Sequence, residues 1–437
     1  MTKNRVFVLD YESVTPLGVG QEAIFESLNS NYMGGREVSS FSTEGLKNHG
    51  AAEAEQDLSR FYQDEPEHIQ RIIAFDRKFE LLFVNYKILK NRLLEIFKDH
   101  DPKRAGVILG VGLDVSPIEK LEPHLEKYMD NPMNAFEKVL IEFNSKEEKA
   151  LSVLQNPLDL SALYLAQELS LAAFQKTVIT ACTSSTQAIT LGYKAISRSQ
   201  ADAVLVGGTD SIINLMAYVA FGKLGVISNS DKDPSLYCRP FDHSRDGTLV
   251  GEASGLCVLA SEEFVRKHNL KPKFEILGFG NTLDGHKITS ADPSGDGMRR
   301  ALSMAIEMSG ISPSDLDYVN LHGTATRLND ELELNSFMEV VGEAASNITV
   351  SSTKSRHGHA IAAAGIQEFN LLCSCMENDF VPGNMNLENP VVESGIDLPK
   401  ANKNKPLTVG MTNNFAFGGV NTSIIVKKLS NYESSVE

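Results

Sequence analysis

The chain has 437 residues, a formal net charge of −16 at pH 7, and 42% hydrophobic against 22% charged residues. These proportions are ordinary for a globular protein with a substantial core, and the acidity argues against broad nucleic-acid binding, which needs a basic face. No apolar run approaches the roughly 18 residues of a membrane-spanning helix, so we expect no membrane segment.

Cysteine usage and the N-terminal residues predict a cytoplasmic protein. The five cysteines are odd in number and lack the spacing of a disulfide framework, which favours free thiols in a reducing compartment. Residues 1–10 lack the long apolar segment of a signal peptide and are typical of a β-strand. Cys373 and Cys375 form a C-x-C pair without other paired ligands, so no metal site is expected.

Short β-branched runs followed by helical patterns predict an α/β fold. In chain order the predicted strands are residues 5–10, 106–110, 177–181, 203–206, 255–260, 273–278, 318–321, 348–351, 407–411 and 422–426. Strands that alternate with helices favour parallel sheets covered by helices. Because both parts of the chain offer similar strands in a similar order, we expect two α/β halves, residues 1–262 and 263–437.

Two further segments are charged or polar and largely helical in pattern. Residues 57–103 contain apolar positions at helical spacing, and the first helix there is expected to pack on the core. Residues 114–154 are predicted to form a lid or a partner-facing insertion.

Cys182 follows the apolar run 178–181 and precedes small hydroxyl residues that begin a helical pattern. A thiol at a helix N-terminus meets free N–H groups and the positive end of the helix dipole, and both favour the thiolate. Most free cysteines are simply small buried hydrophobes, and Cys257 in an apolar run fits that interpretation. The predicted strand-to-helix turn makes Cys182 the candidate nucleophile.

Two histidines lie in glycine-rich surroundings. His322 follows a predicted strand, and the two threonines in residues 323–326 suit a long polar ligand arm. His359 begins a helix of very small residues, where the helix N-terminus keeps an imidazole neutral and able to donate to a thioester oxygen. The alternative for His322 is a loop histidine that is hydrogen-bonded to the backbone. For the segment at His359, the small residues could serve only to let helices pack closely. One cysteine with two neutral histidines suits acyl transfer through a thioester.

Lys354 and Glu333 are the charged candidates, although most lysines and glutamates are surface residues. A buried Lys354 would need a counter-charge, which Glu333 or Asp330 could supply.

Residues 415–421 place two phenylalanines beside Gly418 and Gly419 after a predicted strand. This loop is either a core plug or a mobile gate whose N–H groups approach an oxyanion.

Together these motifs resemble the β-ketoacyl-acyl-carrier-protein synthase family, in the elongating class that includes type II polyketide ketosynthases. The resemblance runs from about residue 5 to residue 427 and rests on five motifs in a fixed order. They are Thr180-Ala181-Cys182-Thr183-Ser184; Arg239-Pro240-Phe241-Asp242 with Arg245-Asp246-Gly247 and Gly251-Glu252; Asn320-Leu321-His322-Gly323-Thr324 with Asp330; Thr353-Lys354-Ser355 with Gly358-His359; and Asn414-Phe415-Ala416-Phe417-Gly418-Gly419-Val420-Asn421.

The resemblance implies the thiolase fold, a five-layer αβαβα arrangement of two duplicated halves, in a dimer. It implies that Cys182 accepts an acyl chain from the phosphopantetheine arm of an acyl carrier protein. His322 and His359 would polarise the thioester of a malonyl-carrier and assist its decarboxylation. The carbanion would then attack the Cys182 thioester and release a 3-oxoacyl-carrier. No metal or redox cofactor takes part in that chemistry.

The resemblance also assigns supporting roles. Lys354 and Glu333 would form an ion pair that orders the site, and the N–H groups of Phe417 and Cys182 would form an oxyanion hole. The substrate-binding and gating residues would be Phe417, Phe415, Thr324, Thr326, Gly418 and Asn414.

Some residues depart from the family pattern. The chain has Thr326-Arg327-Leu328-Asn329-Asp330 where fatty-acid enzymes commonly read Thr-Pro-Leu-Gly-Asp, and its ending is more like that of polyketide ketosynthases. Ala416 replaces a usual glycine, and Arg356-His357 replaces a Met-Thr-like pair. We therefore favour the ketosynthase of a type II polyketide or polyene pathway, paired with a chain-length-factor homologue that lacks the cysteine.

A homodimeric housekeeping fatty-acid elongation synthase is the alternative. A non-catalytic chain-length subunit is disfavoured by the retained Cys182, His322 and His359. A thiolase is disfavoured because the C-terminal glycine-rich loop has no second cysteine. An acidic carrier protein would be repelled by the mean charge, so it would need a local Lys/Arg patch.

Overall fold

The structure is a computed structural model that describes residues 4–113, 157–392 and 395–429. The insertion predicted at residues 114–154 lies outside the described residues. Every strand predicted from the sequence is present, several of them longer than predicted. They are β1 (Val6–Thr15), β5 (Ala105–Val111), β6 (Gln175–Val178), β7 (Ala203–Ser211), β8 (Val250–Ser261), β9 (Phe274–Leu283), β10 (Tyr318–Asn320), β11 (Thr349–Ser351), β14 (Val409–Phe415) and β15 (Val420–Lys428).

These strands are hydrogen-bonded side by side in the order β11-β10-β14-β15-β9-β1-β8-β7-β5-β6. If the strands named above are numbered separately within each half, both halves have the same spatial order, 1-5-4-2-3. The directions repeat as well: strand 5 is antiparallel to both of its neighbours, and strands 4, 2 and 3 are parallel. The backbone thus contains the duplication that the strand pattern predicts.

The expectation of parallel sheets was only partly correct, because both halves are mixed. β14 and β15 are joined by residues 416–419 alone, and a connection that short forces an antiparallel pair. β7 and β8 take the equivalent places in the first half and are antiparallel too. The remaining short strands are β2 (Gly18–Val19), β3 (Gly35–Glu37), β4 (Gly50–Ala52), β12 (Phe380–Val381) and β13 (Lys403–Asn404).

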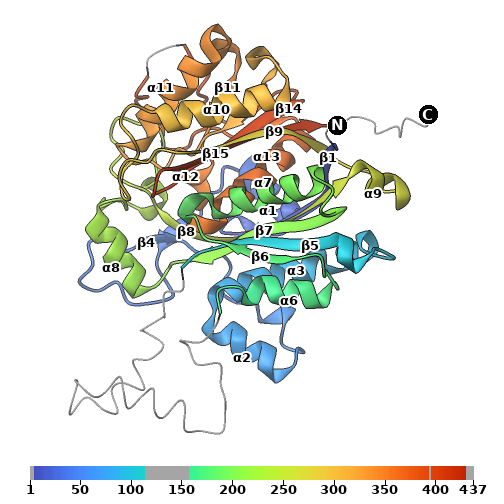
Figure 1. Cartoon of the computed structure of the whole chain (residues 1–437). Helices are drawn as coiled ribbons and strands as arrows, with labels where there is room; N and C mark the ends of the chain where they lie inside the picture. Colours follow the sequence, from blue (N-terminus) through green and yellow to red (C-terminus); the bar gives the residue numbers. More distant parts are fainter. Residues whose placement is uncertain (1–3, 114–156, 393–394, 430–437) are drawn as a thin grey trace, which may run out of the picture.

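Helices complete five layers, which can be followed from bottom to top in Figure 1. α3 (Arg77–Ile96) and α6 (Leu160–Glu168) cover the outer face of the first half, and α10 (Asp296–Ser309) with α11 (Asn329–Val341) covers the outer face of the second. α7 (Ser184–Ser197) and α13 (Ala364–Glu377) pack on each other between the halves. α13 is buried along almost its whole length, as expected for a helix in a central layer.

The other helices lie around these layers. They are α1 (Gln21–Asn29), α2 (Glu67–Phe75), α8 (Leu215–Leu224), α9 (Glu262–Lys267) and α12 (Lys354–His357). α2 and α3 account for the helical pattern at residues 57–103, and α2 packs against α3. Among the described residues, no helix combines the length and apolar character needed to cross a membrane.

Each central helix is preceded by the same kind of tight turn. A short 3₁₀ turn, Ala181–Thr183, precedes α7, and another, Ile361–Ala363, precedes α13. Ala181 has φ 50° and Ile361 has φ 40°, so both turns hold a non-glycine residue in the left-handed region. The two turns contact each other, which brings the N-terminal ends of both central helices to one place.

Two glycines let α7 begin directly on the sheet. A Cβ atom on Gly110 would lie 2.3 Å from the Ser185 nitrogen, and one on Gly208 would lie 2.6 Å from the Ser185 Cβ. No side chain fits at either position, so these glycines fix where the first turn of α7 lies relative to β5 and β7.

Candidate active site

Cys182 lies in the turn between β6 and α7, so the predicted strand-to-helix placement is confirmed. β6 ends at Val178, earlier than predicted, because the chain has to turn through Ala181 before the helix starts. The Cys182 side chain is buried but lines a cavity. A sulfur that is held at a strained turn and faces a cavity is positioned to act as a nucleophile.

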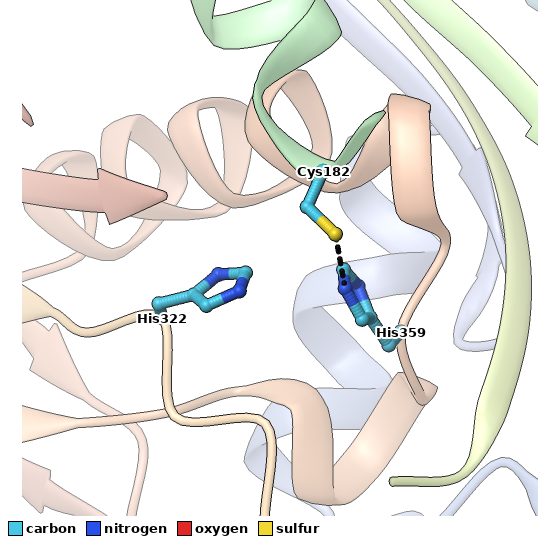
Figure 2. A group of neighbouring side chains, drawn as sticks. All are labelled: Cys182, His322 and His359. Carbon is cyan, nitrogen blue, oxygen red and sulfur yellow. Dashed lines mark hydrogen bonds between the residues drawn. The ribbon is translucent and has the colours of Figure 1, made fainter. Parts of the chain in front are cut away.

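His322 and His359 converge on this sulfur, as Figure 2 shows. His359 Nε2 lies 3.1 Å from Cys182 Sγ, and the two imidazole rings are 5.3 Å apart at 85° to each other. One ligand-type atom from each of the three residues lies within 4.8 Å of the other two. The three predicted residues, which come from opposite halves of the chain, therefore form one cluster.

Burial controls the charge of these three groups. It lowers the pKa of both His322 and His359 well below the ordinary value, and the nearby Lys354 ammonium lowers the pKa of each further. Both imidazoles are thus neutral at pH 7, in keeping with the neutral histidines that the sequence predicts.

The predicted thiolate was wrong for the resting protein. Burial raises the pKa of the Cys182 thiol to about 12, although Lys354 and the N–H groups of Phe417 and Cys182 act in the opposite direction. Desolvation of the sulfur outweighs the groups that favour its charge. The resting site therefore holds a neutral thiol beside a neutral imidazole.

Lys354 is fully buried behind the histidines, and its ion-pair partner differs from the prediction. Its ammonium pairs with Glu368 on α13 instead of Glu333. It also donates to the His322 carbonyl at 2.7 Å and lies 3.3 Å from His322 Nδ1. An ammonium is only a donor, so Nδ1 must accept, and the ring proton is left on Nε2.

Glu333 instead holds the backbone at His322. Its carboxylate accepts from the His322 N–H at 2.7 Å and the Gly323 N–H at 2.8 Å. Burial raises the pKa of Glu333 to about 7. Asp330, the other predicted counter-charge, accepts from the N–H groups of Phe241 and Ala325 and has Arg245 3.9 Å away. Both acids position loops, and neither lines the cavity.

Glu368 is a site residue that sequence reasoning missed. Its second carboxylate oxygen accepts from Asn414 Nδ2 at 2.6 Å, and Asn414 Oδ1 accepts from the Thr186 hydroxyl at 2.5 Å. A buried acid in a helix made mostly of small and apolar residues needs a partner, and that signal is present in the sequence. Asn414, predicted to bind substrate, lies within this network and does not line the cavity.

The cavity above the cluster has a volume of about 240 Å³. Its walls are mostly apolar, with hydroxyls on one side. Thr324 and Thr326 line it, and their hydroxyls lie 3.0 Å apart. The other lining residues include Phe221, Leu224, Val226, Val250, Met298, Arg327, Ile361, Phe415, Ala416 and Phe417. Small-molecule sites usually span roughly 300–1,000 Å³, so a long substrate requires the wall to move.

The loop between β14 and β15 forms part of that wall. Phe415 is buried with its ring 6.2 Å from that of His322, and Phe417 is half-buried with its N–H bonded to Cys182 Sγ. Gly418 has φ 84° and does not line the cavity, but its N–H donates to Ile288 O at 2.6 Å. The loop thus connects the sulfur to the outer rim of the cavity.

Comparison with known proteins identifies the family from matches to most of the chain. Residues 3–264 match the family described as "Beta-ketoacyl synthase, N-terminal domain", and residues 273–388 match "Beta-ketoacyl synthase, C-terminal domain". A curated relative, 3-oxoacyl-[acyl-carrier-protein] synthase 2 of Rhizobium meliloti (strain 1021), is 35% identical over 257 residues. That match spans 58% of this chain and 61% of the relative's length.

Two further proteins match nearly end to end. The protein with the same name from Staphylococcus aureus (strain N315) is 29% identical over 98% of this chain and 99% of its own length. A chain of the solved complex of the ketosynthase ApeO with its chain length factor ApeC, from Xenorhabdus doucetiae, is 25% identical with a TM-score of 0.79, over 98% of each chain. The fold predicted from the resemblance, the thiolase fold of ketosynthases, is confirmed.

The partner of Lys354 can be tested by removing one carboxylate charge at a time. Glu368→Gln leaves a buried ammonium without its counter-ion, and we expect it to lower the free energy of unfolding by about 3–5 kcal/mol. Glu333→Gln loses one acceptor for a backbone N–H, so we expect a loss of about 1–3 kcal/mol. Denaturant titration measures both variants, with Glu331→Gln at an exposed position as the control. A larger loss of stability for Glu333→Gln than for Glu368→Gln would contradict the pairing with Glu368 and favour Glu333 as the partner of Lys354.

The pH dependence of Cys182 alkylation tests the neutral resting thiol. With a pKa of about 12 the thiolate fraction rises about tenfold for each pH unit, so the iodoacetamide rate should climb without a plateau between about pH 7 and about pH 10. Peptide mass spectrometry reads the modification at Cys182, and Cys182→Ser gives the background from the four other buried cysteines. A plateau reached below about pH 8 would contradict the elevated pKa.

Proposed function

Because the chain belongs to the β-ketoacyl synthase family, we propose that it is a 3-oxoacyl-[acyl-carrier-protein] synthase. It would join a malonyl thioester to an acyl chain held on Cys182, with loss of carbon dioxide. The observation that carries this proposal is the convergence of one thiol and two neutral imidazoles at the base of one cavity. The relatives from Rhizobium and Staphylococcus carry this name.

In the first step Cys182 takes the acyl chain from a carrier-bound thioester. The resting thiol is neutral, so it must lose its proton as the sulfur attacks, and His359 Nε2 at 3.1 Å is the nearest base. A new thioester forms on Cys182 while the carrier C–S bond breaks. The proton on His359 then passes to the departing carrier thiolate, which returns the imidazole to its neutral form.

In the second step the malonyl thioester oxygen lies between the two histidines. The Lys354 contact leaves the proton of His322 on Nε2, which can donate to this oxygen. After the first step the ring proton of the neutral His359 is on Nδ1, so it must shift to Nε2, the nitrogen that faces Cys182, before His359 can act as the second donor. When the carboxylate leaves as carbon dioxide, its bonding electrons move into the thioester and form an enolate. Two neutral donors stabilise that charge without a counter-ion in the cavity.

In the third step the enolate carbon attacks the Cys182 thioester carbonyl. The N–H groups of Cys182 and Phe417, which both lie at the sulfur in the resting site, can donate to the oxyanion that develops. Collapse of this intermediate forms the carbon–carbon bond, breaks the Cys182 C–S bond and releases a 3-oxoacyl thioester. The sulfur leaves as a thiolate and takes up one proton to regenerate the resting thiol.

Phe417 is proposed as the gate. The resting cavity is small for a thioester arm. Phe417 is followed by Gly418, which has a left-handed φ, and a Cβ added to Gly418 would have no atom within 4 Å. Motion of Phe417 would widen the cavity without disturbing β14 or β15. Phe415, which is buried against His322, would stay in place.

The cofactor and domain assignments belong to the same proposal. The acyl and malonyl groups arrive on the phosphopantetheine arm of an acyl carrier protein, and the three steps need no further cofactor. The division into residues 1–262 and 263–437 stays a prediction, with the nucleophile in the first half and both histidines in the second. A cytoplasmic location also stays a prediction.

For the pathway we favour a type II polyketide or polyene ketosynthase that pairs with a chain-length-factor-like homologue. A chain of the complex of the ketosynthase ApeO with its chain length factor matches over nearly the whole of this chain. The departures at Arg327 and Arg356-His357 point away from the common fatty-acid pattern. A homodimeric fatty-acid elongation synthase is the second candidate, because the curated relatives carry the fatty-acid-type name.

Two other assignments fit the site less well. A non-catalytic chain-length subunit would not need the cysteine–histidine cluster that Figure 2 shows. A thiolase uses a second cysteine, and among the described residues that line the cavity Cys182 is the only cysteine.

Separate assays of condensation and decarboxylation test the proposed roles. Cys182→Ala should lower condensation by more than roughly a thousandfold because no acyl-enzyme forms, while carbon dioxide release from malonyl-carrier continues. His322→Ala or His359→Ala should each lower carbon dioxide release by roughly 100- to 1,000-fold, the effect of losing one oxyanion donor. Product masses on the carrier and released carbon dioxide are the measurements.

Cys238→Ala is the matched control, because Cys238 is also fully buried with a thiol pKa raised to about 12 but does not line the cavity. It should keep both activities. Normal carbon dioxide release by either histidine variant would refute the assigned role of that histidine.

Purification from the native host tests the pathway. We expect a stoichiometric homologue that lacks the cysteine to purify with the chain, as size-exclusion chromatography and mass spectrometry would show. A homodimer alone that elongates ordinary acyl-carriers with malonyl-carrier would instead establish the fatty-acid assignment.

A further inference from the structure

One wall of the cavity is a single stretch of chain that runs from the catalytic cluster to the surface. Along it, His322 is 2% exposed, Thr324 is 6% exposed, Thr326 is half-buried and Arg327 is exposed. All four residues line the cavity. This gradient orders them by depth, from an imidazole at the base through two hydroxyls to a guanidinium at the mouth.

The backbone holds this stretch in place. Gly323 has φ 35° and Ala325 has φ 64°, and the alternate residues Thr324 and Thr326 line the cavity. A Cβ on Gly323 would lie 2.5 Å from the Ser352 Cβ, which admits no side chain. Arg245, buried behind the wall, donates to the carbonyls of Thr326 and Arg327 at 3.1 Å. The position of Arg327 is therefore fixed at its backbone.

Arg327 is the one cationic side chain among the described residues that line the cavity. The other charged side chain that lines the cavity is Asp246, and both of its oxygens are occupied, by the Ser228 hydroxyl at 2.7 Å and the Asn229 N–H at 3.3 Å. Within the described part of the chain, the Arg327 guanidinium forms no hydrogen bond or ion pair. An exposed cation on a fixed backbone is available to a ligand.

We propose that Arg327 binds the phosphate of the phosphopantetheine arm, so that the enzyme recognises the arm by its charge as well as by its thioester. This inference rests on the proposed function. A guanidinium offers paired donors that match phosphate oxygens. The depth order of the wall matches the ligand: an anion outermost, amides along the two hydroxyls, and a thioester at His322.

The net charge makes such a contact useful. At −16 the protein repels an anionic arm over most of its surface, and one free arginine at the mouth offsets that repulsion where the arm enters. Arg327 also stands where the related fatty-acid enzymes commonly carry a proline, which has no charge to offer. The arginine therefore distinguishes this chain from those enzymes at the entrance to its cavity.

The test compares two small probes that differ only in the phosphate, malonyl-pantetheine and malonyl-phosphopantetheine. The native enzyme should decarboxylate the phosphorylated probe with a KM about tenfold lower, the effect of one charge-assisted contact that is partly exposed. Arg327→Gln should abolish that preference by raising KM for the phosphorylated probe, with kcat unchanged and malonyl-pantetheine unaffected. Lys223→Gln is the matched control. Lys223 is an exposed cation that does not line the cavity, although its neighbour Leu224 does.

Binding of phosphopantetheine and pantetheine, measured by calorimetry, separates this inference from the proposed function. If the native protein prefers phosphopantetheine and Arg327→Gln does not, Arg327 binds phosphate even when no probe is turned over. A phosphate preference that survives in Arg327→Gln would overturn the inference. So would an effect of Arg327→Gln confined to carrier-bound substrates, which would assign Arg327 to the carrier surface.

Discussion

The buried ammonium of Lys354 is the charge around which the site is built. A charge in a protein interior is stable only when it is paired and hydrogen-bonded, and Lys354 finds Glu368 on α13 and the carbonyl of His322. Glu368 is held in turn by Asn414 on β14, and Asn414 by Thr186 at the start of α7. One chain of polar contacts thus ties the helix behind the nucleophile to the loop of the first histidine.

The same burial sets the chemical state of the cluster. Lys354 is close enough to His322 and His359 to oppose their protonation, but it does not make Cys182 a thiolate, because desolvation of the sulfur is the larger effect. The site therefore keeps its one positive charge behind the reacting groups and leaves neutral donors in front. That arrangement suits a reaction in which negative charge appears and disappears on the substrate.

Much of this could be predicted because it is local in the sequence. β-Branched runs and the turns that follow them predicted the strands, and Cys182, His322 and His359 each stand beside a strand end or a helix start. Strand direction depends on connections across the fold, and periodicity carries no information about it, so the antiparallel pairs were missed. Similarly, Asp330, Glu333 and Glu368 are all buried acids, and the sequence does not say which of them faces Lys354. Asn414 shows a different limit: side chains alternate along β14, so Asn414 points to α13 while Phe415 points into the cavity.

The two left-handed turns have a consequence for how such a site comes to be asymmetric. Cys182 follows Ala181 in one turn, and Ala362 follows Ile361 in the other, so Ala362 is the counterpart of the nucleophile under the internal twofold relation. In the first turn the functional group is a side chain, the Cys182 thiol. In the second turn it is the backbone, because the Ala362 N–H donates to Asp210 in the other half. Fusion of two copies into one polypeptide frees each turn to diverge on its own. A symmetric pair of identical subunits has no such freedom, because any residue gained at one turn would appear at both.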